Sequence, residues 1–328
     1  MRLNVPDIAA LNDARTILLI GMGGGYDIFC GLPLRYALQE IGKTVHLANL
    51  SFSRLDVCDA RHIGEAVVKV THETTGGTGY FPERYLCEWF HSRGETVPVY
   101  CFPRVGARPI AAAYQNLVAE LGGSRSPAGT DGGKVDAVVL IDGGTDSLMR
   151  GDECGLGTPE EDSVSLYAVN RLEDVATKLL VCIGFGVDTF HGVSHGHFLE
   201  AVAALSQDGA FLGAWSLLPE MPEAELYKEA VEFVHEQMFN HPSIVNTSIL
   251  SAVEGQFGNY HANYRTDGSD LFINPLMSLY WAFDAVAVAE RNLYLDLLAT
   301  TETVPDVWKT LAMFRANVTQ REWLPLPM

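Results

Sequence analysis

Three stretches of the sequence place glycines and an aspartate directly after a short apolar run. They are Gly21, Gly23, Gly24, Gly25 and Asp27; Asp142, Gly143, Gly144, Thr145 and Asp146; and Gly184, Gly186 and Asp188. Glycine has no Cβ, so a ligand can approach the bare backbone N–H groups, and a following helix N-terminus attracts anions. These residues are therefore the candidate ligand- and anion-binding residues.

The three turns are expected to lie side by side. Open α/β folds bind ligands at the carboxyl ends of their parallel strands, and each turn follows a run of strand length. A single turn of this kind is explained as well by a tight turn whose aspartate caps the next helix. Three such turns in one chain favour a common ligand site.

Several carboxylates at one edge of a sheet repel one another. Two like charges about 4 Å apart repel by about 4 kcal/mol at an effective dielectric near 20. A divalent cation, a cationic substrate, hydrogen bonds from ligand hydroxyls or a raised pKa would each relieve this repulsion. Carboxylate oxygens suit Mg²⁺, so Asp142 and Asp146 are the candidate metal ligands and candidate catalytic residues.

Histidines follow the third turn at positions 191, 195 and 197. His191 and His195 would share one face of a helix and are candidates for a general acid or base, with a transition-metal site as the alternative. Further along, Arg265 is a candidate anion clamp and His261 a second acid–base candidate. A hydrogen-bonded loop that only fixes the local fold is the alternative for this second group.

The first turn matches half of the dinucleotide fingerprint G-x-G-x-x-G. Gly21 and Gly23 fit, but Tyr26 stands at the third glycine position. The next expected strand does not end in an acidic residue that would hold a ribose. Ser51, Ser53 and Arg54 could instead receive a 2′-phosphate, which keeps an NADP-binding interpretation open.

The elements that must position these turns alternate between strand and helix. Buried strands are predicted over residues 16–20, 44–49, 66–70, 137–141 and 178–183, with a last clear strand at 210–216. Residues 97–102 predict an edge strand because they contain a proline. Helices are predicted over 32–41, 82–92 and 109–121, around 198–205 and around 226–234, with a surface loop at 122–134.

A further helix start stands at Thr158, where Pro159 and Glu161 complete the pattern of a capping box. The whole pattern predicts an α/β fold with a doubly wound, mainly parallel, Rossmann-like sheet. We expect residues 1–328 to form a single domain, in which residues 243–328 are a mostly helical subregion packed on the sheet.

Composition limits the partners. The 328 residues include 22 Lys and Arg against 41 Asp and Glu, so a formal charge of −19 argues against nucleic acid and against an acidic membrane surface. The six scattered cysteines contain no Cys-x-x-Cys pair, and the first residues lack a secretory pattern, so a cytoplasmic protein is expected. A small-molecule ligand is the expected partner, and a homo-oligomer stays open.

Two resemblances support a ligand site. Residues 142–147, Asp-Gly-Gly-Thr-Asp-Ser, resemble the pyrophosphate loop Ser-Gly-Gly-x-Asp-Ser of ATP pyrophosphatases in all but the first residue. Residues 21–27, 142–147, 158–162 and 255–266 together resemble a bacterial and archaeal family known as a domain of unknown function. The second resemblance spans nearly the whole chain and implies no activity, but it implies that the glycine turns and the Arg265 loop form one design.

The favoured hypothesis is an enzyme that binds a nucleotide or other phosphorylated small molecule and performs metal-assisted hydrolysis or group transfer, with Mg²⁺ as its cofactor. An NADP-linked oxidoreductase is the first alternative. A non-catalytic small-molecule-binding or assembly protein, in which the aspartates are only helix caps, is the second.

Overall fold

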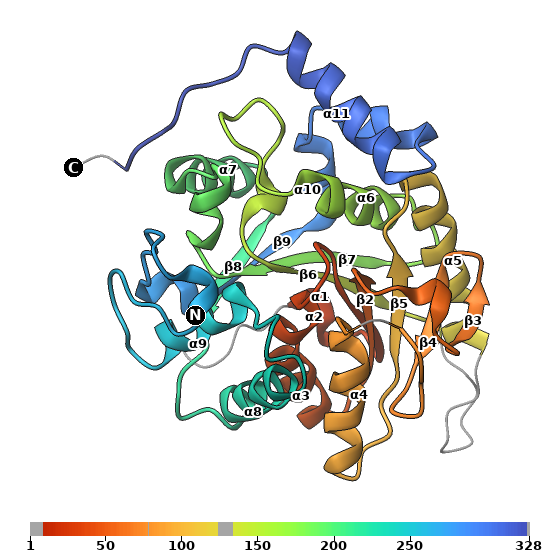
Figure 1. The fold of residues 1–328 in the computed structure, drawn as a ribbon. Helices are drawn as coiled ribbons and strands as arrows, with labels where there is room; N and C mark the ends of the chain where they lie inside the picture. The colour runs from red at the N-terminus through yellow and green to blue at the C-terminus, as the bar shows by residue number, and fades with distance from the viewer. Residues whose placement is uncertain (1–8, 78, 124–133, 327–328) are drawn as a thin grey trace.

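The computed structural model describes residues 9–77, 79–123 and 134–326. In this part of the chain, nine strands form one mixed sheet (Figure 1). In sheet order they are β3 (Arg61–Gly64), β4 (Val67–Val70), β5 (Val99–Pro103), β2 (Thr44–Ser51), β1 (Thr16–Gly21), β6 (Ala137–Gly143), β7 (Thr177–Ile183), β9 (Leu279–Asp284) and β8 (Phe211–Ser216).

The five core strands are parallel, and the strand order reverses at β1. From β1 the chain continues to its neighbour β2 and then to β5, whereas β6 and β7 lie on the other side of β1. The carboxyl ends of β5, β2, β1, β6 and β7 therefore share one edge of the sheet, and the β1–β6 boundary is its topological switch point.

Helices cover both faces of this sheet, because the central strands carry apolar side chains on both faces (Figure 1). Leu18 and Ile20 pack on one face, and Ile17 and Leu19 on the other. The first face carries α5 (Ala107–Gly123), α6 (Pro159–Asn170), α7 (His195–Gln207), α10 (Ala285–Arg291) and α11 (Val304–Asn317). The second carries α1 (Ala9–Asn12), α2 (Asp27–Cys30), α3 (Leu32–Glu40), α4 (Pro82–Ser92), α8 (Pro222–Gln237) and α9 (Ile244–Val253).

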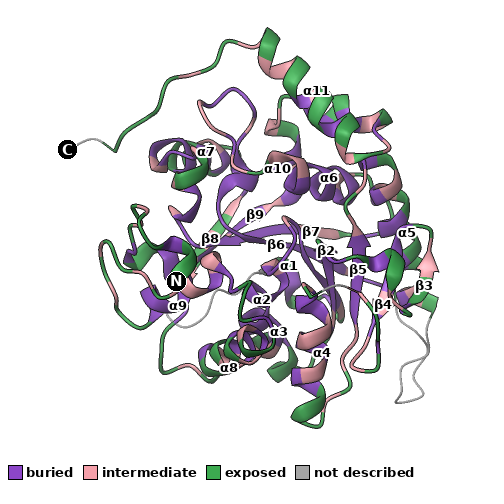
Figure 2. Cartoon of the chain, in the orientation of Figure 1, coloured by how far each residue is buried: buried purple, intermediate pink, exposed green. Residues whose placement is uncertain are grey.

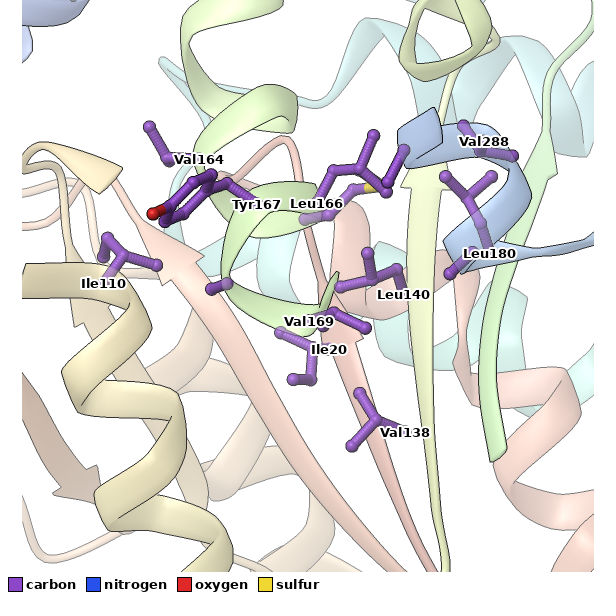
Figure 3. Close-up of a cluster of buried hydrophobic side chains, with 14 of the residues drawn as sticks. Ile20, Ile110, Val138, Leu140, Val164, Leu166, Tyr167, Val169, Leu180 and Val288 are labelled. Carbon is purple, nitrogen blue, oxygen red and sulfur yellow. The ribbon is translucent and has the colours of Figure 1, made fainter. Parts of the chain in front are cut away.

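The core has two layers: one lies between the sheet and α5, α6 and α10, and the other lies between the sheet and α2, α3, α4 and α8. Figure 2 shows that the central strands are buried along their length, whereas α11 is largely exposed. In Figure 3, Ile20, Val138 and Leu140 of the sheet pack against Leu166 and Val169 of α6. This packing fixes α6 above the switch point, which matters for the site.

The predicted α/β class and the helical character of the C-terminal part are confirmed, but the sheet is mixed. Both β4 and β9 run antiparallel to their neighbours. The prediction that residues 210–216 form the last strand is wrong, since β9 pairs with β7 and β8 from within the region expected to be helical. Its apolar run of five residues, which ends at Asp284, is too short to separate strand from helix by periodicity.

Two other predictions about strands need correction. Residues 97–102 do not form an edge strand, because β5 begins after Pro98 and lies between β4 and β2. The predicted strand at 66–70 is β4, and it pairs with β3, which the sequence analysis missed. Most of the predicted loop at 122–134 lies outside the described residues.

All six cysteines are free thiols, as their scattered spacing predicts. Among the helices of the described ranges, none is long and apolar enough to cross a membrane.

The position of β9 between two strands predicts a large effect for Phe283→Ala. Phe283 is fully buried, and its ring lies 5.3 Å from that of Phe211 in β8. Because the substitution leaves a cavity in the core, it should lower the free energy of unfolding by about 3–5 kcal/mol, measured by urea denaturation. Phe239→Ala, at a side chain that is 71% exposed, is the control and should change it by less than about 0.5 kcal/mol. Equal effects of the two substitutions would contradict the placement of β9.

Candidate functional site

The first glycine turn connects β1 to α2. The Gly23 amide donates a hydrogen bond of 2.7 Å to Asp27 Oδ2. From the end of β2, Asn49 Nδ2 donates to the carbonyl oxygen of Gly25 at 2.9 Å and to Glu83 Oε1 at 2.8 Å. The turn is therefore held from inside the protein, and Gly23 and Asp27 stay partly exposed.

The second and third turns are tied to each other. Asp142 is buried at the end of β6, and its Oδ2 accepts a hydrogen bond of 2.5 Å from Ser147 Oγ. The Thr145 amide donates to Asp188 Oδ2 at 2.7 Å. Residues 184–188 follow β7, so this bond joins the ends of two neighbouring strands as the sequence predicted.

Asp146 is held by the start of α6. Both the amide and the hydroxyl of Thr158 donate to Asp146 Oδ2, at 2.7 and 3.1 Å. The predicted capping box at Thr158 is therefore wrong, because its side chain binds Asp146 and makes no cap hydrogen bond to its own helix. The helix begins at Pro159 as expected.

Asp162, in the first turn of α6, brings a third carboxylate to the switch point. Oxygens of Asp27, Asp142 and Asp162 lie within 4.8 Å of one another. Asp162 is 4% exposed, and within the described ranges neither of its oxygens accepts a hydrogen bond from an N–H or O–H group. A buried carboxylate without a donor is costly, so its environment calls for a proton or a cation.

Glycines make room for these carboxylates. A Cβ on Gly23 would lie 2.6 Å from Asp162 Oδ1 and 2.8 Å from Asp27 Oδ2, and a Cβ on Gly143 would lie 2.9 Å from Asp27 Oδ1. These distances are too short for real contacts. At Gly23 and Gly143, glycine is therefore explained by the approach of carboxylates across the turn.

Burial raises the pKa of all five aspartates at this edge. The pKa of Asp27 rises to about 8, through burial first and then through the charges of Asp146 and Glu161, against the Gly23 hydrogen bond. Burial and neighbouring carboxylates also raise the pKa values of Asp142, Asp162 and Asp188 well above their usual range. The pKa of Asp146 rises for the same first reason, opposed by the Thr158 hydrogen bonds.

The described residues offer no basic side chain that neutralises this group. Within the described ranges, none of the five aspartates forms an ion pair with lysine or arginine. Without a cation, the chain must retain protons, and the carboxyl groups of Asp146 and Asp162 lie close enough to share one.

The spacing of Asp27, Asp142 and Asp162 fits a divalent cation. Oxygen ligands lie about 2.0–2.1 Å from Mg²⁺ and about 2.3–2.6 Å from Ca²⁺, so opposite ligands are separated by about 4.2 and about 4.8 Å. Each of the three carboxylates offers an oxygen within 4.8 Å of the other two, so one ion of either kind could contact all three. Small side-chain movements would therefore complete a site for either ion.

The predicted histidines do not form one helical face. His191 ends a 3-10 helix, η3 (Val187–His191), Gly192 follows in a left-handed conformation, and His195 starts α7. His191 is exposed, whereas His195 packs against the Phe185 ring, with its Nε2 buried and unpartnered among the described residues. His197 is buried at the start of α7.

The Arg265 loop approaches the first turn from the α9 side. Arg265 Nη1 donates to the Pro242 carbonyl at 2.9 Å, and Tyr26 donates to the neighbouring His241 carbonyl at 3.2 Å. His261 Nδ1 lies 2.9 Å from Thr266 Oγ1 within the same loop. These contacts fit the hydrogen-bonded-loop alternative, while the exposed Arg265 side chain retains further donors.

The residues proposed for NADP have other partners. Arg54 pairs with Asp56 at 2.7 Å on the surface. Ser53 Oγ donates to the buried Glu83 at 3.3 Å.

Comparison with known families supports the resemblance seen in the sequence. Residues 129–317 match the model of a family described as a protein of unknown function, DUF1152. The chain belongs to this family. No curated protein and no solved structure shows significant similarity to the chain.

The DUF1152 range contains the second and third turns and α6, so it includes Asp142, Asp146, Asp162 and Asp188. It begins after the first glycine turn, and Asp27 comes from outside it.

Sequence reasoning missed Asp162. The signal was present, because residues 160–162 are all acidic in the first turn of a helix that follows the second glycine turn.

The raised carboxyl pKa values predict that the metal-free protein loses stability as the pH rises. Such groups bind protons in the folded state and release them on unfolding, so their stabilisation is complete at low pH and is lost as the pH rises through the folded pKa. Between about pH 6.5, above which histidines are mostly neutral, and the Asp27 pKa of about 8, each retained proton lowers the free energy of unfolding by about 1.4 kcal/mol per pH unit. Denaturation in a chelating buffer measures this slope.

Asp162→Asn should make the slope shallower, because it removes one group that is charged in the unfolded chain and protonated in the fold. Asp296→Asn, at an exposed aspartate paired with Arg171, is the matched control and should leave the slope unchanged. A free energy of unfolding that increases with pH over this range would contradict the assignment of raised pKa values.

Proposed function

We propose that the protein is a divalent-cation-dependent enzyme that acts on a nucleotide or another phosphorylated small molecule by hydrolysis or group transfer. The observation that carries the proposal is the Asp162 carboxylate, which is buried beside Asp27 and Asp142 and accepts no hydrogen bond from an amide or hydroxyl group of the described residues. A cation between these three groups would satisfy Asp162 and offset the repulsion between them.

Asp142 keeps its proposed role as a metal ligand, and Asp27 and Asp162 join it. Asp146 fits the role less well, because its Oδ2 already accepts two hydrogen bonds from Thr158. Asp188 is similarly held by Thr145. We infer that these two aspartates shape the site through their hydrogen bonds to Thr158 and Thr145.

The location supports a phosphorylated ligand. The three carboxylates lie at the switch point of the sheet, where open α/β folds bind ligands, and Gly23 and Asp27 form its partly exposed side. A cation held by two or three carboxylates commonly uses its remaining positions for phosphate oxygens and water. When bound, it would polarise the phosphoryl oxygen and orient an attacking water or hydroxyl group.

Cation binding is predicted to stabilise the fold. Mn²⁺ or Mg²⁺ at a hundredfold excess over its dissociation constant should raise the free energy of unfolding by about 2.7 kcal/mol, detected as a higher Tm. Asp162→Asn should remove most of this increase, whereas Asp296→Asn should retain it. If the Tm of the wild-type protein is unchanged by Mg²⁺, Mn²⁺ and Ca²⁺, the cation site does not exist.

Catalysis is tested separately by phosphate release from a panel of nucleoside and sugar phosphates. The enzyme should require a divalent cation, lose activity with a chelator, and lose it in Asp142→Asn. A protein that binds the cation but turns over no member of the panel would support the non-catalytic binding alternative instead.

A further inference from the structure

The arginine Arg104 lies next to the carboxylate edge, and it has no role in the site described so far. It directly follows β5, whose carboxyl end lies at the same edge of the sheet as those of β1 and β6. Its Nη2 forms an ion pair of 2.5 Å with Glu161 Oε1, and Glu161 precedes Asp162 in α6. Arg104 is thereby placed beside the proposed cation ligands.

Phe52 connects Arg104 to the first glycine turn. Phe52 directly follows β2, and the Arg104 guanidinium carbon lies 5.0 Å from the centre of its ring. A Cβ added to Gly24 would lie 2.5 Å from Phe52 Cε1, and a Cβ on Gly25 would lie 3.5 Å from the same ring. Phe52 therefore lies between Arg104 and the turn at residues 24–25 and contacts both.

The turn itself offers unused donors. Gly24 and Gly25 have φ values of 91° and 61°, which L side chains rarely adopt. Among the described residues, the amides of Gly24 and Gly25 donate no hydrogen bond, whereas the Gly23 amide is used by Asp27. Successive free amides in such a turn are an arrangement that binds anions.

The ion pair of Arg104 leaves most of its guanidinium available. The closest contact to Glu161 is made by Nη2, the Arg104 side chain is 37% exposed, and no hydrogen bond from its other nitrogens is formed within the described ranges. Glu161 is also incompletely satisfied, because its Oε2 is buried and has no partner among the residues that the structure describes. A guanidinium gains more from two parallel hydrogen bonds to a phosphate than from this single contact.

We propose that Arg104 binds the phosphate group of the substrate, together with the amides of Gly24 and Gly25, and exchanges its ion pair with Glu161 for this contact. The inference rests on the proposed function and names a residue outside the range that matched the family. The ligand class is a phosphate ester or anhydride whose phosphate lies between Arg104 and the cation. Phe52 would contact whatever group the phosphate carries.

Arg265 is the competing candidate. Its guanidinium donates to the Pro242 carbonyl, on the side of the turn where Tyr26 and Tyr80 contact His241. Neither an ion pair to the carboxylate edge nor a ring contact to Phe52 is formed by Arg265 among the described residues. Arg104 is therefore better placed to act on a phosphate beside the cation.

Isothermal titration calorimetry of the full chain with pyrophosphate and with ADP, each with and without Mn²⁺, tests the proposal. Arg104→Ala should weaken binding of both probes by about ten- to a hundredfold, and Arg104→Lys should recover part of the loss. Mn²⁺ alone should bind Arg104→Ala and the wild-type protein with similar affinity. The control is Arg108→Ala. Arg108 is an exposed arginine four residues after Arg104 and pairs with Glu302, so its removal should change the affinity for neither probe.

Glu161→Gln should change the affinity for pyrophosphate in the opposite direction to Arg104→Ala, which a purely structural role of Arg104 would not produce. Releasing Arg104 from the carboxylate should tighten pyrophosphate binding, and this gain should disappear in the Arg104→Ala background, as a double-mutant cycle measures. Phe52→Ala should weaken ADP more than pyrophosphate if the substrate is a nucleotide, and both equally if it is not.

The outcomes separate this inference from the proposed function. If the wild-type protein binds the probes and Arg104→Ala binds them with the same affinity, the role of Arg104 is overturned and the cation-dependent function stands. Phosphate binding that depends on Arg104 but not on any cation would support Arg104 and overturn the cation site. Failure of wild-type protein to bind either probe in the presence of Mn²⁺ would overturn both the phosphate substrate and Arg104.

Discussion

Repulsion between buried carboxylates is the constraint on which the site depends. The strand order places the end of β1 beside that of β6, and α6 packs over this boundary, so Asp27, Asp142 and Asp162 meet there. Gly23 and Gly143 permit the approach because a Cβ at either position would collide with an oxygen. With no basic partner for these aspartates in the described residues, the fold must hold protons or a cation, and either choice makes its stability depend on the solution.

The hydrogen bonds around the edge show how the chain tolerates this charge. Gly23, Ser147, Thr145 and Thr158 each donate to a different aspartate, and the bonds from Thr145 and Thr158 join the ends of β6 and β7 to the start of α6. Asp162 is the carboxylate without such a donor among the described residues. Four of the five aspartates therefore accept a hydrogen bond from an amide or hydroxyl group of the described residues, and Asp162 does not. A bound cation would contribute most at Asp162, which is the structural basis for the proposed cation.

Sequence patterns predicted the part of the site that follows from strand ends, and missed the part that depends on packing. The turns at 21–27, 142–147 and 184–188 meet because parallel strands end at one edge, a rule that needs no side-chain detail. Asp162 was hidden because acidic residues in a first helical turn are ordinary capping features. Arg104 was missed because its strand was assigned to an edge, and β9 was missed because five apolar residues fit a helix equally well.

Location of the cation in a crystal is the most direct test of the central claim. Crystals soaked in Mn²⁺ should give an anomalous scattering peak between the carboxylates of Asp27, Asp142 and Asp162, within about 2.0–2.6 Å of their oxygens. A peak confined to surface carboxylates, or none, with the aspartates still in mutual contact, would show that protons alone hold the cluster together and would contradict the account.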